Sequence, residues 1–75
     1  MITKKQLAEL RIRYPNGTRI ELLKMDDFQA PPLGTKGTVV GVDDIGSILV
    51  HWDNGSSLNL IYGEDLFKVI VQEKV

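Results

Sequence analysis

The sequence has no cysteine and only one histidine, His51, in 75 residues. Without cysteine the chain forms no disulfide bond and no cysteine-based zinc site, which are the common staples of domains this short. A chain of this length holds one domain and buries only about 60% of the surface that its unfolded form exposes. We therefore expect a single domain over residues 1–75 with a thin core and with no metal or other cofactor.

Long apolar runs are also missing. A membrane span requires about 18–20 apolar residues, and no run in this sequence approaches that length. The first residues, Met1–Lys5, lack the apolar stretch of a signal peptide. We therefore expect a cytoplasmic protein that does not enter the membrane. Hydrophobic residues at 43% and charged residues at 25% are typical of a folded soluble domain and argue against disorder.

Acidic and basic residues are segregated along the chain, although the formal net charge is only −1. Residues 1–24 hold six basic and two acidic side chains, whereas residues 25–65 hold one basic and seven acidic side chains. The pI of about 5.7 favours packing of the two segments against each other, with partial neutralisation. The alternative is a basic face for nucleic acid, made of Lys4, Lys5, Arg11, Arg13, Arg19 and Lys24.

The N-terminal residues carry the start signal of an amphipathic helix. Thr3 and Gln6 have the spacing of a capping box, in which the threonine oxygen accepts from a helical amide and the glutamine reaches back. Pro15 and the Asn-Gly pair after it end the helical pattern. We expect a helix over about residues 4–13, with Ile12 off the apolar stripe and either exposed to solvent or at a seam.

After residue 17 the hydrophobic pattern changes to a period of two, which indicates β-strands. Between the strands we expect a long proline-containing loop, a tight turn rich in aspartate, an Asn-Gly hairpin of type I′ and one helical or 3₁₀ turn. The first strand has apolar residues in both registers, as in a strand covered on both faces, and Gly41 marks a bulge or a tight bend in the second. The expected strands lie at about 19–25, 37–42, 47–52, 57–60 and 68–71, and the connections at 26–35, 43–46, 53–55 and 62–66.

This order predicts a mainly β fold, a small five-stranded SH3-like barrel over about residues 18–71, preceded by the N-terminal helix. Closing the sheet into a barrel removes free edges that would otherwise pair with other chains. The alternative is a twisted open sheet covered by the helix.

Four segments together carry a resemblance to a known family. They are residues 17–22 with 25–27, 31–32 with 34–39, 42–46, and 50–58. Over about residues 10–70 they resemble a domain of unknown function found in small bacterial and phage proteins (DUF4314). That resemblance implies a fold and brings no known activity.

Two shorter segments resemble other proteins. Residues 50–55, with Tyr62-Gly63 and Asp65-Leu66, are similar to the SH3-like domain of mind-bomb ubiquitin ligases, which implies peptide binding. Residues 34–39 resemble the KOW motif of ribosomal and transcription-elongation proteins, which implies contact with RNA.

Catalytic constellations are missing around the one imidazole. His51 falls on the strand face opposite Trp52, which predicts a surface position, and no Gly-x-Ser-x-Gly elbow supplies a nucleophile. The adjacent aspartates Asp26-Asp27 and Asp43-Asp44 are typical of turns and lack the spacing of a calcium loop. We therefore expect a protein that is not an enzyme.

Few aromatic residues are present, and three of them fall in elements that line the peptide groove of SH3 domains. Trp52 shares a strand face with Ile48 and Val50, which favours core packing over groove lining. The predicted partner site consists of Phe28, Pro31, Pro32, Tyr62 and Trp52.

The sequence thus predicts a non-enzymatic SH3-like binding or adaptor module for a protein or peptide partner. The alternative is a KOW-like accessory domain that contacts nucleic acid through the basic N-terminal segment. A homodimer formed through the helix is also open.

Overall fold

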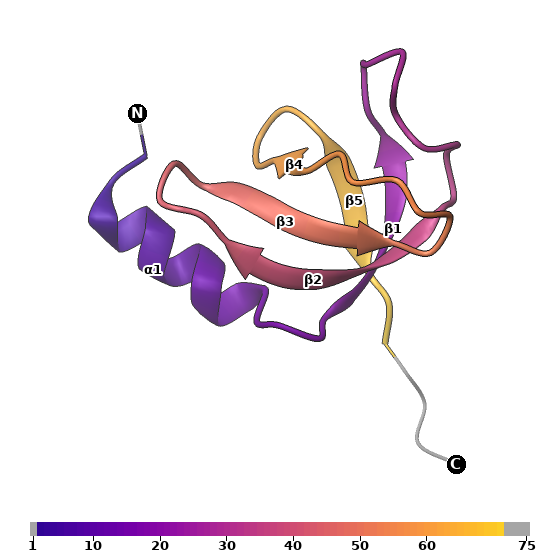
Figure 1. Ribbon diagram of the computed structural model, residues 1–75. Coiled ribbons are helices and arrows are strands. Elements are labelled where there is room, and N and C mark those ends of the chain that lie inside the picture. The colour runs from indigo at the N-terminus through magenta and orange to yellow at the C-terminus, as the bar shows by residue number, and fades with distance from the viewer. Residues whose placement is uncertain (1, 72–75) are drawn as a thin grey trace.

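An α-helix precedes an antiparallel five-stranded sheet in the computed structural model, which describes residues 2–71 (Figure 1). The chain forms α1 (Lys4–Arg13), β1 (Arg19–Lys24), β2 (Lys36–Val42), β3 (Ser47–Trp52), β4 (Leu60–Ile61) and β5 (Leu66–Val69). The strands are ordered β4-β3-β2-β1-β5, so the last strand returns beside the first. The mainly β fold with one N-terminal helix is confirmed.

The helix begins and ends where the sequence predicts. The Gln6 amide donates to Thr3 Oγ1 at 3.1 Å, and the Thr3 amide donates to Gln6 Oε1 at 3.0 Å, which completes the capping box. Ile12 is exposed, as expected, while Leu10 is buried and α1 packs against β2. Ten residues are too few for a membrane span, and no helix in the described part of the chain is long and apolar enough to cross one.

The core lies on one face of the sheet and is closed by the helix end. Trp52 is 1% exposed, and its indole N–H donates to the Leu58 carbonyl at 2.6 Å. The alternation predicted for β3 is confirmed, since its apolar face is buried and His51 is exposed. The buried core residues are Leu10, Tyr14, Ile20, Leu22, Val39, Ile48, Val50, Trp52 and Leu60.

The predicted closure into a barrel is not observed, because the described sheet is open with β4 and β5 at its edges. Strand β4 has only two residues, which pair with the first two residues of β3. The Ile61 amide then donates to the Asp65 carboxylate at 2.8 Å, so a side chain takes the place of a further strand. Of the two predicted architectures, the open sheet with an N-terminal helix agrees with the structure.

The hairpin after β3 also differs from the prediction. A type I′ turn needs positive φ at both central residues, but in the described chain only glycines have positive φ, among them Gly55 at 88°. The Gly55 amide donates to the Trp52 carbonyl at 3.0 Å, and the following polar residues stay outside the ladder. The fourth strand therefore begins at Leu60 rather than near residue 57, since the Leu58 carbonyl is held by the Trp52 indole.

Smaller differences concern β1, the last turn and β5. A bulge near Leu23 leaves that side chain exposed, so β1 is not covered on both faces. The segment between β4 and β5 is a hydrogen-bonded turn rather than a helical one, and β5 begins two residues earlier than predicted. The bulge predicted at Gly41 is confirmed by the register shift in β2.

Candidate functional site

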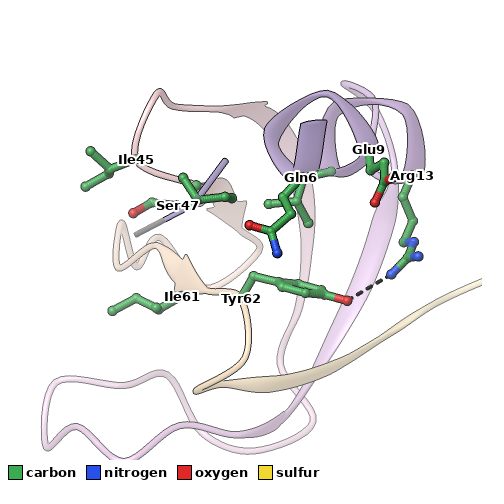
Figure 2. A pocket seen from close by; sticks show the side chains of 10 residues that line it. Gln6, Glu9, Arg13, Ile45, Ser47, Ile61 and Tyr62 are labelled. Carbon is green, nitrogen blue, oxygen red and sulfur yellow. Dashed lines mark hydrogen bonds between the residues drawn. The ribbon is translucent and has the colours of Figure 1, made fainter. Parts of the chain in front are cut away.

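A groove of about 520 Å³ lies between α1, the turn after β2 and the end of β4 (Figure 2). We call it the helix groove. Its wall carries a polar row from α1 that faces apolar side chains from the turn and from β4. The residues that line it are Ile2, Gln6, Glu9, Leu10, Arg13, Ile45, Gly46, Ser47, Ile61 and Tyr62.

The turn between β2 and β3 is shaped by Asp43 and by Gly46. The Asp43 carboxylate accepts from the amides of Ile45 at 3.2 Å and Ser47 at 2.8 Å, as expected for an aspartate that stabilises a turn. Gly46 has a φ of 88°, and a Cβ there would lie 2.7 Å from Ile2 Cδ1. Glycine thus allows Ile2 to pack against the turn, while Ile45 at the tip is 78% exposed.

Tyr62 is held at the other side of the helix groove. Arg13 Nη1 donates to Tyr62 Oη at 2.9 Å, so the phenol ring points towards the helix (Figure 2). Its ring lies 6.3 Å from that of Tyr14, which in turn packs edge-on against Phe67 at 5.2 Å. The hydrogen bond at its hydroxyl and the contact with Tyr14 orient the Tyr62 ring, which presents apolar surface to the helix groove.

The structure does not bring all the predicted partner residues to one place. Phe28 is 97% exposed in the loop between β1 and β2, which lies at the end of the sheet away from α1 (Figure 1). In the same loop Pro32 is exposed and Pro31 is buried. Trp52 is in the core, which confirms the packing that its strand face favours, and Tyr62 lines the helix groove.

The basic N-terminal segment is partly neutralised by the acidic one. Arg11 bonds Asp44 at 3.0 Å, and Arg19 makes two hydrogen bonds with Asp53 at 2.6 and 2.8 Å. Lys4 and Lys5 at the start of α1 and Lys24 at the end of β1 are exposed. The predicted neutralisation is therefore confirmed for Arg11 and Arg19.

The bidentate pair lowers the pKa of Asp53. Hydrogen bonds from the Arg19 guanidinium stabilise the charged carboxylate, and the positive charge of Arg19 adds to the effect. A carboxyl whose pKa is lower in the folded state stabilises the fold above its unfolded pKa of about 3.9. That stabilisation is lost as the pH falls through the lower folded value.

We expect Arg19→Gln to return the titration midpoint of Asp53 towards about 3.9, because the substitution removes the guanidinium. The carboxyl carbon shift of Asp53, followed by NMR between about pH 2 and 6, measures it. Arg11→Gln, which removes the partner of Asp44 instead, is the control and leaves the Asp53 midpoint unchanged. An Asp53 midpoint that is the same in wild type and Arg19→Gln would contradict the assignment.

His51 is exposed on the outer face of β3, opposite Thr38 of β2. Within residues 2–71 no group of three or more histidine and carboxylate side chains is placed to hold a metal ion. The side chains that line the helix groove can cover apolar surface and form hydrogen bonds at its rim. Glu9 offers an acceptor there and Arg13 a donor.

Among the residues that line the helix groove, only Tyr62 and Arg13 were predicted as site residues from the sequence. Ile45 is the residue with the clearest signal, because an isoleucine in a tight turn with two aspartates and a glycine has no core to enter. No such signal marks Ile61, Gln6 or Glu9. These residues come close to one another only because the helix packs against the sheet.

The protein is thus a small antiparallel β domain with an N-terminal helix, and the helix groove lies between that helix and the sheet. The chain belongs to the family described as Domain of unknown function (DUF4314), whose profile matches residues 3–70. That match confirms the resemblance and includes the helix and all five strands. The chain matches none of the curated proteins and none of the solved structures with which it was compared. The likenesses to mind-bomb domains and to the KOW motif stay predictions.

Proposed function

We propose that this protein is a non-enzymatic binding module that takes a protein or peptide partner in the helix groove. The observation that carries the proposal is the set of exposed apolar side chains, Ile45, Ile61 and Tyr62, around a concave surface with buried Leu10 in its wall. Covering apolar surface contributes about 25 cal/mol per Å². Concave sites with a central aromatic residue are where binding energy concentrates in protein interfaces.

The size and polarity of the helix groove indicate the chemistry of the partner. Ligand pockets typically measure about 300–1,000 Å³, so a groove of about 520 Å³ accepts one or two apolar side chains. Glu9 and Arg13 at the rim place opposite charges beside that apolar surface. The partner is therefore a segment with an apolar anchor flanked by polar groups that bond Glu9 or Arg13.

The strand order supports an SH3-like relationship for this module. Strand β5 returns beside β1, as it does when a five-stranded meander begins to close, and the longest loop joins β1 to β2. In peptide-binding SH3 domains the groove is built from loops and aromatic side chains. Here the proposed groove uses the helix in addition.

The proposal is tested with two isoleucines that are matched in exposure. Ile45 in the helix groove is 78% exposed and Ile12 on the helix is 80% exposed. A random peptide library displayed on phage is selected against the wild-type protein, and a selected peptide is then titrated by calorimetry. We expect Ile45→Lys to raise its dissociation constant at least about tenfold, because the substitution places a charge in the apolar contact.

Ile12→Lys is expected to leave the dissociation constant unchanged, since Ile12 does not line the helix groove. Far-UV circular dichroism of both variants verifies that the fold is intact. Equal affinities of Ile45→Lys and wild type, or a library that yields no peptide, would contradict the proposal.

The alternative of nucleic-acid binding has less support, because Arg11 and Arg19 are engaged in ion pairs with Asp44 and Asp53. A basic patch that binds phosphates releases counterions, so its affinity falls steeply with salt. Binding of DNA or RNA that is lost in Lys4→Ala/Lys5→Ala would favour that alternative over the helix groove.

A further inference from the structure

The two edges of the sheet differ in how they are protected. At β4 the Asp65 carboxylate accepts from the Ile61 amide at 2.8 Å and blocks that edge. At β5 the only strand or helix in the described chain that makes contact is β1. Free edges of sheets pair with other strands unless something covers them. The edge at β5 is therefore available to pair with another strand.

The register between β1 and β5 shows which backbone groups of β5 are free. The Ile70 amide donates to the Arg19 carbonyl at 2.8 Å, and Lys68 lies opposite Glu21. In an antiparallel pair, hydrogen-bonded and non-hydrogen-bonded positions alternate, so the amides and carbonyls of Phe67 and Val69 point away from β1. Continuing the alternation places those of Val71 on the same side.

The free edge also carries apolar side chains that are exposed in the described chain. Val69 is 46% exposed and shares the core face of the sheet with Phe67, and Val71, two residues further on, is 84% exposed. On the other face Leu66 is exposed as well. An extended, apolar strand with alternating free backbone groups matches this edge, and β5 itself is such a strand.

We propose that β5 pairs antiparallel with β5 of a second copy, with the two-fold axis at Val69. In this register Val69 lies opposite Val69 of the second copy, and Phe67 lies opposite Val71. The outward amides and carbonyls at all three positions then find partners. The apolar side chains of these residues pack across the new pair of strands.

Charge selects this register over its neighbour. A two-fold axis at Lys68 would place two ammonium groups directly opposite each other, which destabilises strand pairs. With the axis at Val69, Lys68 lies opposite Ile70 of the second copy and keeps its own ion pair with Glu21, at 3.7 Å. The register at Val69 therefore pairs the outward backbone groups and avoids two lysines directly opposite each other.

Sedimentation equilibrium of the purified chain tests the dimer directly. Three pairs of residues make a small interface, so we expect a weak dimer with a mass that rises between about 10 µM and 1 mM towards twice the 8.4 kDa of one chain. Val69→Pro is expected to raise the dissociation constant at least about tenfold, because the ring removes the outward amide and blocks the partner strand. The proline leaves the bonds between β1 and β5 intact, because the lost amide does not face β1.

Two further variants keep the test decisive. Val71→Lys lies outside β5, so it preserves the fold, and it is expected to weaken the dimer by placing an ammonium group opposite Phe67. Ile12→Lys tests a dimer formed through the helix and is expected to have no effect. Amide exchange of Val69 is expected to slow at least about tenfold as the protein concentration rises. A monomer at about 1 mM, or a dimer that only Ile12→Lys dissociates, would overturn the proposal.

Discussion

Trp52→Ala is expected to move the urea midpoint of unfolding well below that of wild type. Trp52 is 1% exposed and lies in the core, and its indole N–H donates to the Leu58 carbonyl. Removing a buried tryptophan costs about 3–5 kcal/mol. The total free energy of unfolding of a domain this small is about 4–11 kcal/mol, at about 0.05–0.15 kcal/mol per residue. One substitution thus removes a large share of the stability.

Urea unfolding followed by far-UV circular dichroism measures this effect without relying on tryptophan fluorescence. Trp52→Phe is expected to lie between wild type and Trp52→Ala, because it keeps most of the apolar volume but leaves the Leu58 carbonyl without its donor, at a cost of about 1–3 kcal/mol. Phe28→Ala is the control on the surface and is expected to change stability by less than about 0.5 kcal/mol. A Trp52→Ala protein with the midpoint of wild type would show that the core is assigned incorrectly.

Gly37→Ala is expected to destabilise the fold by about 1–3 kcal/mol through overpacking. Gly37 lies opposite Trp52 in the register of β2 and β3. A Cβ at this position would lie 2.6 Å from Val50 Cγ1 and 2.8 Å from Trp52 Cε3, both of them core atoms. Its third neighbour is the His51 carbonyl oxygen at 3.2 Å, which is backbone and yields less easily than a side chain.

Gly41→Ala in the same strand provides the matched control. A Cβ at Gly41 would lie 3.7 Å from Leu49 Cδ1, which is ordinary contact. Because alanine has fewer conformations in the unfolded chain than glycine, we expect stability to be unchanged or slightly increased. Thermal unfolding of both variants gives the comparison, and an equal loss of stability at the two positions would argue against steric crowding at Gly37.

Local signals made the helix and the middle strands predictable from sequence. The helix ends are fixed by residues three apart, Thr3 and Gln6, and by Pro15, so no tertiary information is needed. Strand β2 is rich in β-branched residues and the two faces of β3 alternate along its six residues. The bounds of both strands agree with the prediction within one residue. Burial of Trp52 follows from the same alternation.

Tertiary contacts determine the features that the sequence did not predict. The start of β4 depends on a hydrogen bond from the Trp52 indole to Leu58, and its end on the Asp65 carboxylate. The sheet stays open because β4 is so short, and the amino-acid composition of the chain does not indicate this. The residues of the helix groove come from three separate segments, so only the packing of α1 against the sheet brings Gln6 near Ile61.

Tertiary packing also explains why the residues of the predicted partner site do not lie together in the structure. Aromatic content and turn chemistry identify Phe28 and Tyr62 as candidates, but they do not say on which end of the sheet each side chain lies. The structure places Phe28 in the loop away from α1 and Tyr62 beside Arg13 (Figures 1 and 2). The helix groove is therefore assigned from geometry, and Phe28 stays a prediction from the sequence.

The measurement that tests the proposed function most directly is an amide-shift titration of the wild-type protein with the peptide selected from the library. We predict that the largest shift changes fall on Ile45, Gly46, Ile61 and Tyr62, which line the helix groove. They are expected to be absent from Ile12 and from the loop that holds Phe28. Changes confined to that loop, or to Lys4, Lys5 and Lys24, would contradict binding in the helix groove.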